Sequence, residues 1–311
     1  MTKTWVGALI LGSLAVSACN EAPRTESTVT VSEPIINGAP ADEAKYRAVA
    51  ALVYTIPDTD IVLDAFCSAT LVAPKTVVTA RHCTPAITEA PANGLGVAVA
   101  FGPDALASTL VVPITDFATA PPAPPPESGL LRDGGRDVAV VHLASAPVGI
   151  PPAKLGKFQE SMVGTKFQIA GFGINNFQGF YGTKYAGPAT ARATSGKWYP
   201  LLFKNDRRAF TSWYFTDSAL AAPSQAEADQ WWVLYKLENK YELLAGGLPG
   251  EAVGCYGDSG GPLLLGSNAQ TLTTYGVSFA VEGTFSTVCG LGGAYSVFNP
   301  TLYDFVKARL R

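Results

Sequence analysis

The sequence is poor in charge and especially poor in histidine. Charged residues make up 15 % of the 311 residues, the formal net charge is -3, and His82 and His142 are the only histidines. It contains no basic run, no zinc-ligand spacing and no glycine-rich loop followed by Lys and Ser or Thr. Binding of nucleic acids or nucleotides therefore has little support, and we expect no metal ion or organic cofactor.

The chain also lacks the alternation of strands with long amphipathic helices that a doubly wound α/β sheet requires. From residue 35 onward, short runs of Val, Ile, Thr and aromatic residues are separated by Gly, Pro and Asp. Seven such runs are VAALVYTI, SATLVA, TVVTA, VAVAFG, DVAVVHL, TKFQIAGFG and TYGVSFAV. This pattern predicts an all-β protein, either a sandwich or a barrel of antiparallel strands.

Three segments depart from the strand pattern. Residues 121–129, PPAPPPESG, predict an exposed loop because proline cannot donate hydrogen bonds to a strand ladder. The region from about 175 to 250 includes PSQAEADQWWVLYKLENKYELL, which fits a helix or a pair of strands, and periodicity does not decide between them. Residues 301–311, TLYDFVKARLR, predict a C-terminal helix whose basic residues suit the helix dipole.

Residues 1–18 have the features of an export signal. A lysine precedes an apolar run from Trp5 to Val16, which is too short to cross a bilayer. The stretch VSAC resembles the lipobox of bacterial lipoproteins, in which the cysteine, here Cys19, receives a lipid. Ordinary cleavage after Ala18 fits the small residues equally well, but Cys19 would then be an unpaired fifth cysteine. We therefore favour a lipid on Cys19.

The next segment, residues 19–34, is polar and rich in Thr, Ser and Glu, as is typical of a tether or propeptide. We expect an exported protein. It would be held in the cell envelope, on the periplasmic or outer face, through the lipid on Cys19, or secreted after release. The lipid would be its only contact with a membrane, and the sequence does not predict an oligomeric state.

The stretch GCYGDSGGP, residues 254–262, places Ser259 between glycines. The pattern fits the nucleophile elbow of α/β-hydrolases, G-x-S-x-G, and also a tight glycine turn. In an α/β-hydrolase the catalytic acid and then the histidine follow the serine. Both histidines precede Ser259 here. That arrangement is therefore excluded, whereas a triad in the order His, Asp, Ser remains available.

Three motifs in that order resemble the signature blocks of the trypsin-like (chymotrypsin-fold) serine peptidases. They are TARHC around His82, DVAVVHL from Asp137 and GDSGGP around Ser259. Further similarity lies in IING at 35–38, FCSATLVAPKTVVTARHC, AGFG at 170–173, YGVSFA and GGAYSVF. The resemblance covers 35–173 and 253–311. It implies two six-stranded antiparallel β-barrels, residues 35–152 and 153–300, with an insertion at about 175–250, and a polypeptide substrate.

The resemblance also implies a Ser-His-Asp triad. Ser259 would attack the carbonyl of a peptide bond, His82 would take its proton, and Asp137 would orient the imidazole. Asp133 lies in the same turn, but we prefer Asp137 because the apolar strand VAVV follows it directly. The backbone amides of Gly257 and Ser259 would form the oxyanion hole.

Supporting residues follow from the same resemblance. The implied disulfides are Cys67–Cys83, beside the histidine, and Cys255–Cys289, beside the serine. Ser278 matches the family serine that hydrogen-bonds the triad aspartate. His142 lies five residues after Asp137, on the opposite face of the strand, and is expected to be structural.

The resemblance also identifies the residues that would set the substrate preference. Val253 would lie at the base of the pocket that binds the side chain before the cut, and Ala280 and Gly293 would form the walls of that pocket. Without a carboxylate at the base, an Arg or Lys side chain would enter unpaired. We therefore expect cleavage after apolar residues such as Leu, Phe, Tyr or Met. A charge from Glu251 or Glu282 would reverse this preference.

Activation is expected to involve the N-terminus. Family zymogens are cut to free an isoleucine whose ammonium pairs with the aspartate beside the serine, here Ile35 with Asp258. Pro34 precedes that cut, and a trypsin-like activator would not accept it readily. Either another peptidase processes the site or the uncut chain is poorly active.

A further departure is Arg81, where the family usually has Ala. The alternative to an active peptidase is a non-activated homologue that serves as a binding or regulatory protein.

Overall fold

Strands dominate the computed structural model, which describes residues 35–123, 135–174, 181–216, 224–282 and 289–311. Each of the seven apolar runs predicted to form strands overlaps an observed strand. The predicted export signal, Cys19 and the segment 19–34 lie outside the described residues, as does most of the proline-rich stretch 121–129.

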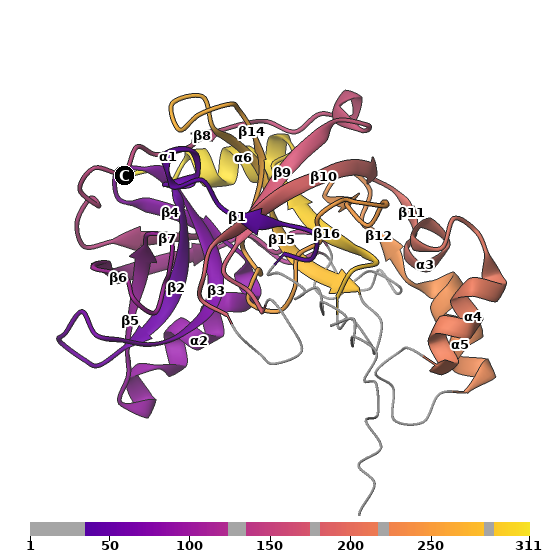
Figure 1. Ribbon diagram of the computed structural model, residues 1–311, viewed down its shortest axis with the longest axis horizontal. Helices are drawn as coiled ribbons and strands as arrows, with labels where there is room; N and C mark the ends of the chain where they lie inside the picture. The colour runs from indigo at the N-terminus through magenta and orange to yellow at the C-terminus, as the bar shows by residue number, and fades with distance from the viewer. Residues whose placement is uncertain (1–34, 124–134, 175–180, 217–223, 283–288) are drawn as a thin grey trace, which may run out of the picture. The chain divides into compact units, whose positions relative to one another are not determined.

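Six strands close a first antiparallel barrel in the order β2-β3-β4-β7-β6-β5 (Figure 1). They are β2 (Val49–Thr55), β3 (Val62–Ala73), β4 (Thr76–Thr79), β5 (Gly96–Phe101), β6 (Leu110–Thr119) and β7 (Ala139–Leu143). Leu52, Val77, Val99 and Val141 belong to its core and are fully buried. β-Branched side chains suit a pleated, buried surface, which explains why these runs form strands.

A second ring of six antiparallel strands runs in the order β9-β10-β13-β16-β15-β14, and it is closed because β14 also pairs with β9. The six are β9 (Lys166–Gly171), β10 (Tyr185–Ala193), β13 (Glu242–Ala245), β14 (Pro262–Leu265), β15 (Thr273–Glu282) and β16 (Gly292–Val297). Two short strands are added to this ring: β1 (Ala39–Pro40) pairs with β10, and β8 (Lys154–Leu155) pairs with β15. Its core includes Phe167, Ile169, Leu243 and Leu263. The prediction of two six-stranded antiparallel barrels is confirmed.

Helices in the described part of the chain are short. They are α1 (Glu43–Tyr46), α2 (Thr84–Glu89), α3 (Trp198–Leu202), α4 (Arg207–Thr216), α5 (Gln225–Leu234) and α6 (Pro300–Lys307), with 3-10 turns at η1 (Arg81–Cys83), η2 (Pro91–Asn93) and η3 (Glu160–Met162). Helix α6 follows Asn299, whose side chain accepts a hydrogen bond of 2.9 Å from the Leu302 amide. The cap and the proline at the first helical position favour the start of the helix here. The predicted C-terminal helix is confirmed, although it ends at Lys307.

Helix α6 helps to join the two barrels. Leu302 and Val306 of this helix share one apolar cluster with Val78 and Val140 of the first barrel and with Val277 of the second. Burial of this shared surface resists separation of the barrels. The position of one barrel on the other matters because the candidate catalytic residues are divided between them.

The region from 175 to 250 contains both helices and strands, which are the two alternatives that the sequence periodicity did not decide between. Strand β10 is followed by the helices α3, α4 and α5 and by a small sheet of β11 (Gly196–Lys197) with β12 (Lys236–Leu237). Within the undecided stretch, α5 is capped by Ser224, and β12 and β13 follow it. Only Ala228 of α5 is buried. The helix therefore lacks the apolar stripe by which its periodicity would have been recognised.

Candidate active site

His82 and Asp137 meet at neighbouring strand ends of the first barrel. Strands β4 and β7 pair with Thr79 opposite Ala139, so the turn after β4 lies beside Asp137, two residues before β7 begins. The backbone amide of His82 donates to Asp137 Oδ1 at 2.8 Å, and His82 Nδ1 lies 2.5 Å from Asp137 Oδ2. Asp137 is only 1 % exposed. Both carboxylate oxygens are therefore used to fix the histidine.

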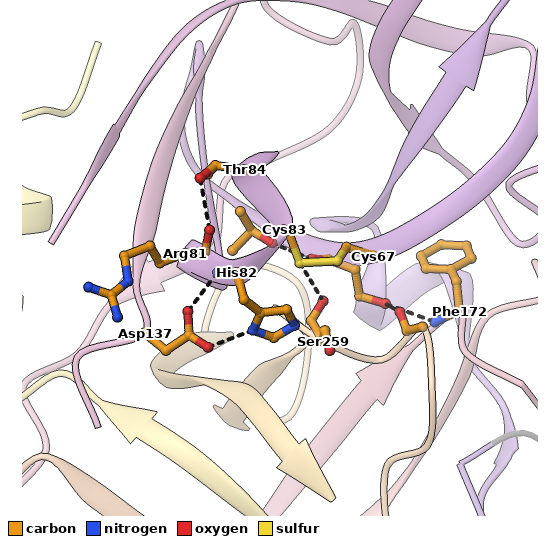
Figure 2. The surroundings of a disulfide bond; sticks show 11 residues. Cys67, Arg81, His82, Cys83, Thr84, Asp137, Phe172 and Ser259 are labelled. Atoms are coloured by element: carbon orange, nitrogen blue, oxygen red, sulfur yellow. Dashed lines mark hydrogen bonds and ion pairs between the residues drawn. A yellow bond between two sulfur atoms is a disulfide. The ribbon is translucent and has the colours of Figure 1, made fainter. Parts of the chain in front are cut away.

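Ser259 reaches the same place from the second barrel. In Figure 2 the imidazole of His82 lies between Asp137 and Ser259. His82 and Ser259 also line one cavity of about 380 Å³, which we call the serine pocket. Its other walls include Phe66, Gly257 and residues 278–281. The backbone amide of Ser68 donates to the Ser259 carbonyl at 2.8 Å and so ties the serine loop to β3 of the first barrel.

The backbone around Ser259 leaves two amides free. Within the described residues, neither the Gly257 amide nor the Ser259 amide donates a hydrogen bond. Gly257 has a φ of +93°, which favours glycine, and the Ser68 hydroxyl donates to its carbonyl at 3.0 Å. Both residues line the serine pocket. The two amides are thus available to an oxygen that develops negative charge in the pocket.

Both predicted disulfides are present. Cys67 and Cys83 are joined across a Cα–Cα distance of 6.3 Å, and Cys255 and Cys289 across 5.4 Å. The first holds the turn that carries His82, as Figure 2 shows. The second begins in the loop that carries Ser259. Cross-links of this kind typically add about 2 to 4 kcal/mol to stability.

The first barrel and the strands after it match a known protein family. A family model described as Trypsin matches residues 35–199, more than half of the chain. The chain belongs to the trypsin family. Among solved structures it is similar to neuropsin, a serine protease expressed in the limbic system of mouse brain, with a TM-score of 0.55 and 18 % identity, over 87 % of this chain and 98 % of that one. An identity this low concerns the fold alone, and no curated protein matches the chain.

The specificity residues expected of a trypsin-family member are only partly in the serine pocket. Ala280 lines it, together with Phe279 and Val281. Val253 is 1 % exposed and Gly293 is also buried, and neither lines the pocket. Ile36 forms a backbone β-bridge with Val253, and a Cβ added to Gly293 would lie 3.3 Å from the Tyr295 ring.

Neither of the two glutamates that would reverse the expected preference faces the serine pocket. The carboxylate of Glu251 accepts hydrogen bonds from the amide and the hydroxyl of Thr190. That of Glu282 accepts them from Trp198 Nε1 and the Tyr199 hydroxyl, each at 3.3 Å. The pocket walls around Ala280 therefore remain apolar.

The predicted hydrogen bond between Ser278 and the triad aspartate is wrong in this structure. The Ser278 hydroxyl is buried and lines the serine pocket but makes no bond to Asp137 among the described residues. Instead the Asp137 amide donates to the Ser296 hydroxyl at 3.2 Å. Ser296 lies on β16, directly opposite Ser278's neighbour Val277. No motif of the sequence pointed to Ser296.

A second set of contacts that the sequence did not reveal holds the loop before Asp137. The Gly135 amide donates to the buried carboxylate of Glu242, and Arg136 pairs with Glu238 at 2.8 Å. A Cβ on Gly135 would lie 2.4 Å from Glu242, so only glycine fits this approach. Burial raises the pKa of Glu242 to about 8. The loop that carries the first barrel's aspartate is therefore anchored on the second barrel.

His142 has the structural role that was predicted for it. Its Nδ1 contacts Asp116 Oδ1, and its Nε2 lies 2.8 Å from the Arg309 carbonyl near the C-terminus. The hydrogen bond with His142 lowers the pKa of Asp116. The imidazole of this second Asp–His pair uses its other nitrogen on a backbone carbonyl, and the pair attaches the end of the chain to β6 and β7.

Metal ligands and membrane spans have little support in the described part of the chain. There, the only cluster of three potential metal-binding side chains is Cys67, His82 and Cys83. Its two sulfurs form the disulfide, so they offer no thiolate. No helix among these residues is long and apolar enough to cross a bilayer.

Asp258 is a buried carboxylate without a cation. Its two oxygens accept hydrogen bonds of 2.8 Å from the amides of Gly173 and Cys255, and no described residue forms an ion pair with it. Burial raises its pKa from 3.8 to about 6, although the two amides favour the charged form. Ile35 is 1 % exposed and lies in the apolar cluster of the second barrel, with its amide still joined to Pro34.

This burial predicts an unusual pH dependence of stability for the uncut chain. The folded state holds the Asp258 proton more tightly than the unfolded state, so this contribution is complete below about pH 4 and is lost as the pH rises through 6. From pH 4 to pH 7, the free energy of unfolding of the wild type minus that of Asp258→Asn should fall by about 2 kcal/mol. Urea titrations at each pH measure both values, and pH-independent costs of the substitution cancel.

The same comparison on protein cut before Ile35 serves as the control. A free ammonium beside Asp258 would favour the charged form, so the difference should no longer fall with pH. A difference that rises with pH in the uncut chain would contradict the assignment, because it would mean that Asp258 already has a cationic partner.

Proposed function

We propose that this trypsin-family chain is a serine endopeptidase that hydrolyses peptide bonds through an acyl-enzyme. One observation carries the proposal: His82 and Ser259 line the same pocket, and His82 is fixed by a buried Asp137. The two free amides in that pocket supply the remaining part of such a site. A polypeptide is accordingly the proposed substrate.

Each group has a defined step in this reaction. With Nδ1–H donating to Asp137, the other nitrogen of His82 is free to accept the Ser259 proton as the hydroxyl attacks the carbonyl. The amides of Gly257 and Ser259 stabilise the oxyanion, and each such donor is typically worth about 3 kcal/mol. The imidazolium then protonates the departing amine. Water, activated by the same base, hydrolyses the ester of Ser259.

The chain contains a matched control for the triad in its second Asp–His pair. We expect Asp137→Asn to lower kcat for an activated peptide ester by about 10⁴-fold, because the imidazole loses its orientation and charge support. Asp116→Asn removes the same charge from the pair with His142, and it should change kcat by less than threefold. Steady-state kinetics on protein processed before Ile35 measure both.

Circular dichroism spectra establish that each variant is folded. Equal losses in the two variants would contradict the proposal, because they would trace the effect to the barrel instead of to the triad. Full activity in folded Asp137→Asn would contradict it directly.

We also propose that apolar side chains are preferred before the cut. Phe279, Ala280 and Val281 form one wall of the serine pocket, and Glu251 and Glu282 face other partners. A cation in such a pocket loses hydration without gaining a partner, at a cost of several kcal/mol. Leu, Phe, Tyr and Met lose no such hydration.

A panel of peptide anilides that differ only in the residue before the cut tests this preference. We expect kcat/KM for Leu or Phe to exceed that for Arg or Lys by about 100-fold or more. Norleucine, which matches the length of lysine without its charge, is the control and should behave like Leu. A panel in which Arg or Lys is best would contradict the proposed pocket.

We further propose that full activity requires cleavage between Pro34 and Ile35. The new ammonium would pair with Asp258, whose buried charge otherwise lacks compensation. Ile36 already bridges to Val253, so the cut end would remain seated in the second barrel. The same uncompensated Asp258 supports the alternative function: without the cut, the chain would act as a binding or regulatory homologue.

The cell envelope is the proposed location, with Cys19 lipidated and residues 19–34 as the tether. The motif VSAC and the pairing of the other four cysteines support this proposal. Cleavage before Ile35 would release the peptidase from its anchor.

A further inference from the structure

A second hollow opens beside the serine pocket. Its volume is about 260 Å³, and we call it the Asp64 hollow after the single carboxylate among its lining residues. It shares Phe66, Cys67, Tyr256 and Gly257 with the serine pocket. Gly257 carries one of the two amides proposed to bind the oxyanion. The Asp64 hollow therefore begins where the reacting carbonyl would lie.

The hollow lies on the side of the departing half of the substrate. The serine pocket continues along residues 279–281 of β15, where the side chain before the cut is proposed to bind, and none of these residues lines the Asp64 hollow. A peptide with its acyl half against β15 must place the residues after the cut beyond Gly257. The Asp64 hollow lies on that side, against Cys67.

The lining of the hollow combines aromatic rings with one acid. Phe66, Phe172, Tyr181 and Tyr256 supply the rings, and Asp64 supplies the carboxylate. Ring faces attract cations through the negative charge of the π system, and a nearby carboxylate adds a direct ion pair. The space is below the usual range of about 300 to 1,000 Å³ for ligand pockets, so it suits one side chain.

The charge of Asp64 is not neutralised by the described residues around it. Its Oδ1 accepts a hydrogen bond of 2.7 Å from the Ala65 amide, and the Tyr181 hydroxyl donates to its side chain, which raises the pKa of that phenol. No described cation forms an ion pair with it. Half-burial leaves the carboxylate open to a ligand while it weakens competition from water.

One cation does lie near the hollow, but it is already balanced. Lys184 Nζ is 5.4 Å from the ring centroid of Phe172. Its side chain is fully buried, and it pairs with Glu43 at 2.7 Å. This pair adds no net charge near the Phe172 ring.

We propose that the Asp64 hollow binds a cationic side chain of the first or second residue after the cut, and that Asp64 is the residue that selects it. The inference rests on the proposed peptidase function, because it assigns a substrate preference to the same site. Arginine is favoured over lysine, since its planar guanidinium stacks on aromatic rings and meets a carboxylate with two donors. The preferred substrate thus has an apolar residue before the cut and a basic one after it.

Acyl transfer to added amines measures this side of the site separately. Acyl-Ser259, formed from an acetyl-phenylalanine methyl ester, is offered Ala-Arg-amide, Arg-Ala-amide or the matching peptides with citrulline, the neutral isostere of arginine. The amine attacks the ester carbonyl, its C–N bond forms as the bond to Ser259 Oγ breaks, and the amine proton passes through His82 to that oxygen. The ratio of peptide to free acid reports amine binding.

In the wild type, we expect one of the two arginine amides to give a ratio of peptide to free acid at least tenfold higher than that of its citrulline counterpart. We call this quotient the arginine-to-citrulline ratio. Asp64→Asn should reduce that ratio to near 1. Asp60→Asn, at an exposed position in the loop between β2 and β3, removes the same charge and should keep the ratio. An unchanged ratio in Asp64→Asn would overturn the inference, even though turnover of the ester would uphold the peptidase function.

A binding measurement keeps the inference testable without turnover. Calorimetry on Ser259→Ala protein compares a peptide that has Phe before the cut and Arg after it with the citrulline peptide. We expect at least tenfold tighter binding of the arginine peptide, lost in Ser259→Ala/Asp64→Asn. Equal affinities for the two peptides would overturn the inference. A preference for arginine in protein that has been cut before Ile35 and still hydrolyses no ester would uphold the hollow and refute the peptidase function.

Discussion

The hydrogen bond from the Ser68 amide to the Ser259 carbonyl is the contact on which the site depends. His82 and Asp137 belong to the first barrel and Ser259 to the second, so a small shift between the barrels would separate nucleophile from base. Orientation of reacting groups supplies a large share of catalysis, and a misplacement of about 1 Å can cost 100-fold in rate. The apolar cluster under α6 and the bond from the Asp137 amide to Ser296 hold the same boundary.

Buried charge is the second constraint on this arrangement. Asp258 beside the nucleophile and Glu242 behind the Asp137 loop both lie in places that disfavour ionisation. Glu242 is satisfied by backbone amides, and it serves to hold a loop. Asp258 has the same kind of partners, and it is the group that the proposed activation would pair with the ammonium of Ile35. A single cleavage would therefore change the charge balance next to the oxyanion hole.

The sequence predicted the parts of the site that are marked by rigid local patterns. Ser259 between glycines, His82 beside Cys83 and Asp137 before an apolar strand all stand in short motifs, and the structure brings the three side chains to one place. Runs of Val, Ile, Thr and aromatic residues likewise predicted antiparallel strands, and the resemblance to the trypsin-like peptidases implied that these strands form two barrels. Ser296, Glu242 and Ser68 were missed because each acts through a contact over more than 100 residues of chain, and nothing local distinguishes it. The assignment of Val253 and Gly293 to substrate preference stays a prediction, since neither is among the described residues that line the serine pocket.

Covalent labelling tests most directly whether these residues form a working site. Protein with Ile35 at its N-terminus is treated with a fluorophosphonate, and the adduct is located by mass spectrometry of its peptides. The account predicts one adduct, on Ser259, and its absence in Ser259→Ala and in denatured protein. An adduct on another residue, or labelling that persists in Ser259→Ala, would contradict the account.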